Sequence, residues 1–149
     1  MQIANKLGLK GIAEIYVREA GGEWKLIRRV PNILTDDFLS KIMDTQTPSA
    51  YGYFAVGDGS GTPSGSDTAL FNETFRKAVS STIKETQSDF YYKWECYITT
   101  TEYTGNISEF GLFDAASAGN MMNHIAFASF YKSNTMEVRI DYYLYLTRL

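Results

Sequence analysis

Residues 136–149 read Met-Glu-Val-Arg-Ile-Asp-Tyr-Tyr-Leu-Tyr-Leu-Thr-Arg-Leu. Apolar side chains recur at every second position of this stretch, at Val138, Ile140, Tyr142, Leu144 and Leu146. That period is typical of a β-strand. Tyr143 and Tyr145 lie between these positions, so the strand is apolar or aromatic on both faces. A strand with one face in water should carry polar residues there. We therefore expect either a central strand covered on both faces or an outer face that contacts another subunit.

The same period predicts strands throughout the rest of the chain. Residues 9–17 and 24–30 are joined by Gly21-Gly22, which predicts an N-terminal hairpin over about residues 9–30. We expect a clear strand near Tyr92–Ile98, with Trp94 in the core. Further extended segments are predicted at residues 52–56, 75–86, 107–113 and 121–131.

Helical spacing is found in one short segment. Phe38, Leu39, Ile42 and Met43 share a helical face. Thr35 is a suitable N-cap before two aspartates, so we expect a helix from about residue 36 to residue 44.

These elements predict one mainly β domain over residues 1–149. Short turns between strands favour antiparallel pairing, and two packed sheets would cover the apolar faces. Aromatic residues make up 15% of the chain, which also favours strands. The expected fold is an antiparallel β-sandwich with Greek-key or jelly-roll-like connections and one short helix.

Composition argues against several classes of function. The net charge of −3 does not favour nucleic-acid binding. A single cysteine, Cys96, precludes an internal disulfide, and one cysteine with one histidine precludes the usual zinc sites. We see neither a signal peptide nor a membrane-spanning run, so we expect a soluble protein made in a cytoplasm, without cofactor or metal.

The loop at residues 57–66, Gly-Asp-Gly-Ser-Gly-Thr-Pro-Ser-Gly-Ser, invites a phosphate-binding interpretation. It lacks the lysine of a Walker loop, and its glycines do not have the dinucleotide-binding spacing. Asp58 begins a faint calcium-loop pattern, but the twelfth position is Ala69 where a glutamate is needed. We interpret the segment as a flexible surface loop.

Candidate catalytic residues are few. Glu109 and Asp114 are paired carboxylates, which we expect to be solvated or to cap turns. His124 has no nearby Asp or Ser motif that would form a triad, so a structural role is predicted. Cys96 lies on an apolar strand face and is predicted to be buried and unreactive. No enzymatic activity is expected.

Tyrosines favour an oligomeric contact, because the ring buries area while its hydroxyl remains bonded. Tyr91, Tyr97 and Tyr103 add to the aromatic surface suggested by the last strand. The residues expected at an interface are Tyr143, Tyr145, Gly57, Asp58, Gly59, Ser60 and Gly61.

Two segments resemble a module of tailed-bacteriophage virion proteins, over roughly residues 31–149. Its loop pattern, G-x-G-x-x-x-P…D-T-x-L, is matched at Gly57, Gly59, Pro63, Asp67, Thr68 and Leu70. Its strand pattern, I-x-E-x-G-L-F-D, is matched from Ile107 through Glu109, Gly111, Leu112, Phe113 and Asp114, with Lys132 in the closing turn. One departure is His124, near a position where the module often has arginine.

The resemblance implies a structural protein of the tail, baseplate, collar or fibre-attachment region. It would form a cyclic homo-oligomer and bind other virion proteins, and it would reach the virion after synthesis in the host cytoplasm. We keep as alternatives a carbohydrate- or receptor-binding module that takes a host glycan, a capsid decoration protein and a wall-degrading hydrolase. Neither nucleic acid nor membrane is an expected partner.

Overall fold

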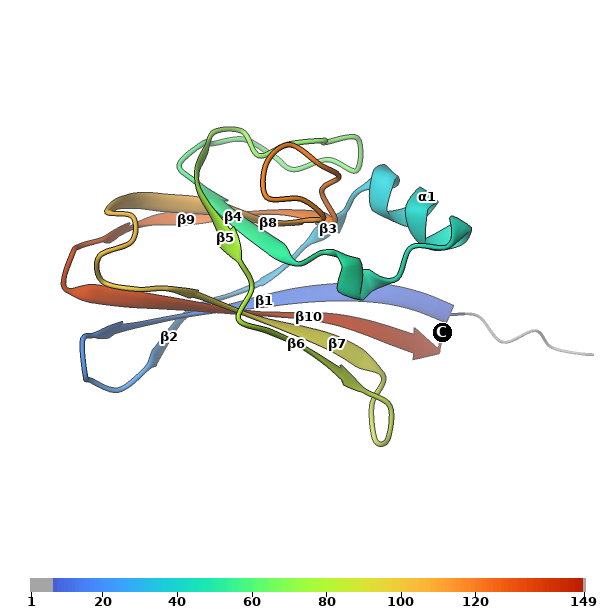
Figure 1. Ribbon diagram of the computed structural model, residues 1–149, viewed down its shortest axis with the longest axis horizontal. Helices are drawn as coiled ribbons and strands as arrows, with labels where there is room; N and C mark the ends of the chain where they lie inside the picture. Colours follow the sequence, from blue (N-terminus) through green and yellow to red (C-terminus); the bar gives the residue numbers. More distant parts are fainter. Residues whose placement is uncertain (1–6, 149) are drawn as a thin grey trace, which may run out of the picture.

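Two five-stranded antiparallel sheets pack face to face (Figure 1). The computed structural model describes residues 7–148. The first sheet has the order β2 (Lys25–Pro31), β1 (Leu7–Glu19), β10 (Met136–Arg148), β7 (Tyr91–Ile98) and β6 (Ser81–Glu85). The second has the order β3 (Ile33–Leu34), β9 (Asn123–Lys132), β8 (Gly105–Phe113), β4 (Tyr53–Gly57) and β5 (Glu73–Ala78).

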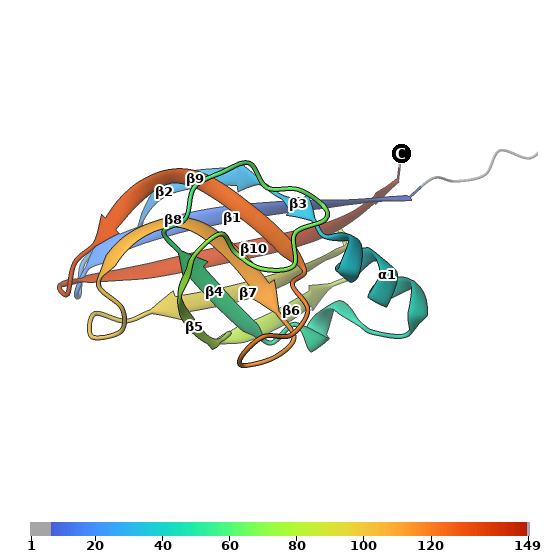
Figure 2. The ribbon, with the colours of Figure 1, turned by 90° about the horizontal axis from the view of Figure 1, so that it is seen from above.

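The chain passes repeatedly between the two sheets. It crosses from β2 to β3, from β5 to β6, from β7 to β8 and from β9 to β10. Strands distant in sequence therefore become neighbours, and β10 pairs with both β1 and β7. Strands of the second sheet run across those of the first at an angle (Figure 2). The predicted antiparallel β-sandwich is confirmed.

The predicted N-terminal hairpin is confirmed, but the extended segment at residues 75–86 is two strands. β5 pairs with β4 in the second sheet, and β6 pairs with β7 in the first. The switch occurs at Val79 and Ser80, whose N–H groups donate to Gly52 O at 2.9 Å and Glu95 O at 2.8 Å, respectively. Both halves are extended, so side-chain periodicity does not reveal that the backbone changes its partner sheet.

The single predicted α-helix is α1 (Asp36–Asp44), and it lies at one end of the sandwich. Thr35 is its N-cap, since its hydroxyl accepts a hydrogen bond from Phe38 N at 3.1 Å. Asp36 and Asp37 lie in the first turn, where their negative charges interact favourably with the positive end of the helix dipole. A short 3₁₀ turn, η1 (Pro48–Ala50), follows. Thr35 N also donates to Met122 O at 2.9 Å, which anchors the helix to β9.

The core lies between the sheets. Trp94 is fully buried, as predicted, and so is Leu112. The Trp94 ring nitrogen donates to Tyr51 O at 3.0 Å, so the indole is buried with its polar group satisfied. The ring centroid of Tyr142 lies 5.7 Å from that of Trp94 and 6.2 Å from that of Phe110. The contact with Phe110 packs β10, the central strand of the first sheet, against β8 of the second.

Leu112→Ala should lower the free energy of unfolding by about 2–5 kcal/mol, because the fully buried side chain would leave a cavity. Leu26 is 45% exposed and provides the matched control. Leu26→Ala should cost less than about 0.5 kcal/mol. Urea denaturation of both variants measures the difference. Equal losses for the two variants would contradict the placement of Leu112 in the core.

Candidate functional site

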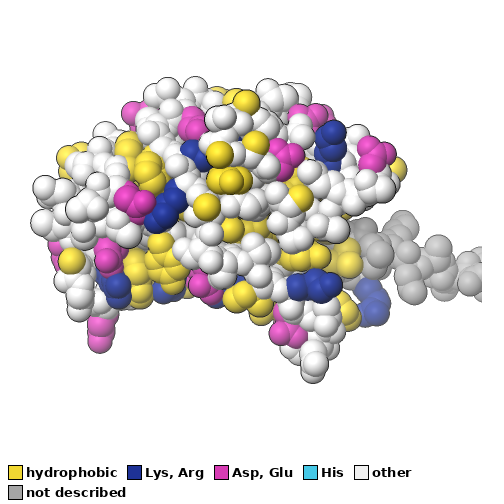
Figure 3. Space-filling model, viewed as in Figure 1, with side chains coloured by type: hydrophobic (Ala, Val, Ile, Leu, Met, Phe, Trp, Pro, Cys, Tyr) yellow, Lys and Arg dark blue, Asp and Glu magenta, His cyan; other side chains and the backbone are white. Residues whose placement is uncertain are grey.

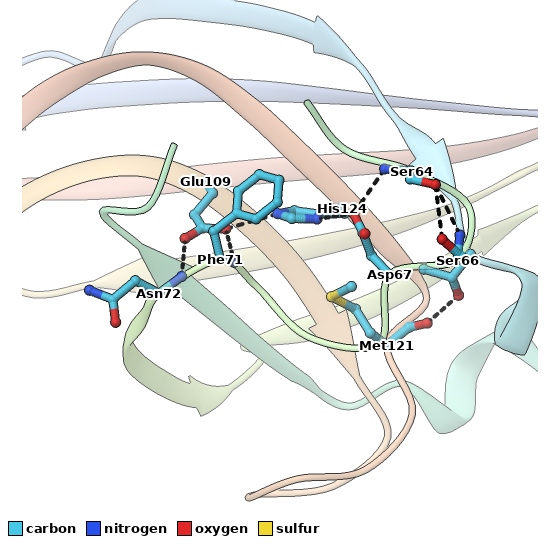
Figure 4. A network of polar contacts seen from close by, with 9 residues as sticks. Ser64, Ser66, Asp67, Phe71, Asn72, Glu109, Met121 and His124 are labelled. Atoms are coloured by element: carbon cyan, nitrogen blue, oxygen red, sulfur yellow. Dashed lines mark hydrogen bonds and ion pairs between the residues drawn. The ribbon is translucent and has the colours of Figure 1, made fainter. Parts of the chain in front are cut away.

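The loop pattern and the strand pattern singled out in the sequence meet in one buried polar network, drawn in Figure 4. Glu109 comes from β8, His124 from β9 and Asp67 from the loop of residues 58–72 between β4 and β5. The His124 Nε2 atom lies 2.8 Å from Glu109 Oε1, and its Nδ1 atom lies 2.7 Å from Asp67 Oδ2. The side chains of His124 and Glu109 are fully buried.

Glu109 holds the 58–72 loop against the second sheet. Its Oε1 accepts from Phe71 N at 2.8 Å, and its Oε2 accepts from Asn72 N at 2.8 Å and from Gly59 N at 3.0 Å. One carboxylate therefore fixes both ends of the loop and bonds the imidazole. The expectation that Glu109 is solvated is wrong, because the loop folds back over the outer face of the sheet and seals the carboxylate from water.

Both ring nitrogens of His124 face carboxylate oxygens. A ring nitrogen that carries a hydrogen donates to its carboxylate, so the imidazole ring is fixed between two acidic side chains. The Phe71 ring covers it, with ring centroids 4.5 Å apart. The sequence shows no Asp or Ser motif near His124, but the fold brings Asp67 and Glu109 to it. Because both nitrogens are engaged by carboxylates, neither is available to activate a hydroxyl or thiol.

Glycine is required where the loop meets this network. A Cβ at Gly57 would lie 2.3 Å from Asn72 O, and one at Gly59 would lie 2.6 Å from Glu109 Oε2. Gly57 is buried, and Gly59 is held by Glu109. The interpretation of residues 57–66 as a flexible surface loop is therefore wrong for its first residues.

Other residues of the strand pattern also have structural roles. A Cβ at Gly111 would lie 2.8 Å from Asn123 O, so β8 and β9 approach closely there. Asp114 caps the following loop, as expected, by accepting from Asn120 N at 2.7 Å. Burial raises the pKa of Asp114, but hydrogen bonds from Asn120 and Gln46 outweigh this and lower it overall.

The remaining matched positions divide into buried and exposed ones. Leu70 and Phe113 pack in a small apolar cluster with Ala55 and Met121. Lys132 is buried, and its ammonium donates to Ser133 O at 3.1 Å and Thr100 O at 3.3 Å. Burial lowers its pKa, and Glu102 and Glu137 oppose that shift. Thr68 is exposed.

A tyrosine face, defined by Tyr91, Tyr143 and Tyr145, lies on the outer side of the first sheet. The rings of Tyr143 and Tyr145 stack with centroids 5.8 Å apart, and Tyr91 lies 5.6 Å and 5.5 Å from them. β10 is thus central in its sheet, with its inner face covered by the second sheet. Among residues 7–148, no further layer covers the outer face. That side is hollowed between two projecting tips in Figure 3.

Tyr97 and Tyr103 do not belong to the tyrosine face. Tyr97 lies beside Trp24 with ring centroids 6.1 Å apart, and Tyr103 packs on Phe75 at 6.1 Å. The Tyr103 hydroxyl donates to Asn106 O at 2.7 Å. The proposed aromatic surface is therefore smaller than the sequence suggested, because the alternation of one strand does not show how neighbouring strands are ordered.

Charged residues run across the same outer side next to the tyrosine face. Asp141 is 4% exposed and pairs in register with Glu14 on β1 and Glu95 on β7. The pKa of Asp141 is raised above its ordinary value, chiefly by burial, although the charges of Arg139 and Lys93 act to lower it. The Arg139 Nε atom lies 3.3 Å and the Lys93 Nζ atom 3.9 Å from Asp141 Oδ2. These acidic and basic side chains lie side by side on the outer side of the sheet. They therefore suit a contact with a partner surface that also carries both signs of charge.

Residues 7–148 contain no group of three or more His, Cys, Asp or Glu side chains placed to hold a metal ion. Cys96 is buried, as predicted, and burial raises the pKa of its thiol. Over the same residues, no helix has the length and apolar character needed to cross a membrane. Comparisons with protein-family models, curated proteins and solved structures find no match.

Proposed function

We propose that this protein is a non-enzymatic structural component of a tailed-phage virion, present in repeated copies in the tail, collar or fibre-attachment region. The observation that carries the proposal is the buried network of Asp67, Glu109 and His124. The phage-like segments meet there, and they hold a long loop onto a sheet. Their conspicuous residues thus have structural roles of the kind a rigid building block needs.

The same network argues against a hydrolase. An acid–base pair must reach substrate in a cleft. The side chains of Glu109 and His124 have no exposed surface, and the polar atoms of both are engaged inside the protein. Cys96, whose thiol could be a nucleophile, lies in the core among apolar residues.

The tyrosine face is the proposed contact with a neighbouring subunit or another virion protein. Its rings are rigid, half-buried and held by one another, so little side-chain entropy is lost on binding. In a closed ring each subunit uses two different surfaces, since the contacts are heterologous. The exposed part of the 58–72 loop, at Asp58, Ser60 and Gly61, remains the second predicted contact.

Mass measurement tests this proposal. Light scattering and native mass spectrometry of the purified protein should give an oligomer of fixed size. Quantitative mass spectrometry of purified particles should find the chain at a fixed ratio to other tail proteins. Recovery with capsid fractions would favour the decoration alternative, and clearing of cell walls in a turbidity assay would favour the hydrolase. A monomer that is absent from particles would overturn the proposal.

A further inference from the structure

A polar cleft opens on the second sheet where β9 bulges away from β8. Ile107 pairs with Phe130 and Glu109 pairs with Ala126, so Ser108 alone faces residues 127–129. Such a bulge bends its strand and interrupts the ladder. The resulting cleft has a volume of about 510 Å³, within the range of about 300–1,000 Å³ of small-molecule sites.

The opposite wall of the cleft is the start of the 58–72 loop, and it is held in place from below. Gly59 N donates to Glu109 Oε2 at 3.0 Å, while the Ser108 hydroxyl donates to Gly59 O at 2.6 Å. Both the N–H and the C=O of Gly59 are therefore bonded to β8 residues. This wall of the cleft rests on the buried network, so its backbone is positioned before a ligand arrives.

The lining determines which ligands fit. It consists of hydroxyl groups, an amide, one carboxylate and one aromatic ring, mainly Asp58, Ser60, Asn106, Ser108, Ser129 and Phe127. Among the described residues, none that lines it is Lys, Arg or His, so an anion would find no countercharge. One carboxylate is too few for calcium, which takes six to eight oxygen ligands. The mixture of hydrogen-bonding groups around a ring face suits a neutral polyhydroxylated molecule.

We propose that this cleft binds a neutral saccharide of one or two sugar rings. Asp58 and Asn106 are exposed and accept or donate hydrogen bonds to sugar hydroxyls. Phe127 is half-buried: its ring packs against the core and lies 6.2 Å from that of Phe130, and the part of the residue left exposed adds apolar surface to the cleft wall. The cleft is separate from the tyrosine face, which lies on the other sheet, and this proposal assigns Asp58, Ser60 and Gly61 to a saccharide in place of the second subunit contact.

Saturation-transfer NMR and amide chemical-shift titration test this inference. The probes are maltose, cellobiose, lactose, diacetylchitobiose and rhamnose, each up to about 10 mM, so that a Kd of about 1 mM, equivalent to about −4 kcal/mol, is still detected. At least one probe should bind and shift the amides of residues 58–61 and 126–129. Ser129→Leu, which fills the cleft, should weaken binding at least about tenfold.

Two further variants separate loss of the site from loss of the fold. Asp58→Asn removes the charge but keeps an oxygen to accept from Asn72 Nδ2, and it should also weaken binding. Ser117→Leu lies in the exposed loop after β8 and should leave binding unchanged. The proposal is overturned if no probe binds, if the shifted amides lie elsewhere, or if both cleft variants bind as the wild type does.

Discussion

Glu109→Ala should lower the free energy of unfolding by about 3–5 kcal/mol, the range seen when one partner of a buried ion pair is removed. The substitution leaves the Nε2 atom of His124 without its partner inside the protein. It also removes the acceptor of three backbone N–H groups, those of Gly59, Phe71 and Asn72. Urea denaturation should show the loss, and hydrogen exchange should show faster exchange at these three amides.

Two controls identify the cause of this loss. Glu109→Gln keeps the side-chain shape but points an NH₂ group at a backbone donor, so a loss of about 1–3 kcal/mol is expected. Glu23→Ala removes an exposed glutamate in a turn and should change stability by less than about 0.5 kcal/mol. A loss below about 1 kcal/mol for Glu109→Ala would show that other contacts hold the loop.

Most of the fold could be predicted because its signals are local. The strands alternate with a period of two residues, and α1 combines a helical face with a capping threonine. It was harder to predict which sheet each strand joins. The switch at Val79 and Ser80 and the separation of Tyr103 from the tyrosine face depend on which strands become neighbours, which is a property of the whole topology.

The polar network was missed for a related reason. The period of two residues puts Glu109 and Gly111 on the face of β8 opposite Phe110 and Leu112, which lie in the core, and such an outer face normally meets water. Here the 58–72 loop folds back over it, and no periodic signal shows where a loop lands. The partners of His124 are 57 and 15 residues away in sequence. One usable signal existed: the predicted strands at residues 107–113 and 121–131 would pair as a hairpin, which brings Glu109 and His124 close.

The double variant Tyr143→Glu, Tyr145→Glu should remain folded but fail to assemble. Both rings lie outside the core and contact chiefly each other and Tyr91, so removing them leaves the packing between the sheets intact. At an interface, however, two carboxylates would be buried next to Asp141, and the nearby cation, Lys93, already pairs with Asp141 and Glu95. Truncating aromatic anchors of this kind typically costs 2 kcal/mol or more, so incorporation should fall at least about thirtyfold.

Tyr131→Glu is the matched control, because Tyr131 is 58% exposed and lies on β9 of the other sheet. It should enter particles at the wild-type level. Circular dichroism and thermal melting establish that each variant is folded, and mass spectrometry of purified particles measures incorporation. If the double variant unfolds, Tyr143 and Tyr145 serve the packing of the subunit itself, and the contact must lie elsewhere. If it folds and enters particles as the wild type does, the tyrosine face is not the interface. Loss of incorporation by the double variant alone would leave one explanation, that these two rings are buried against a neighbour in the assembled particle.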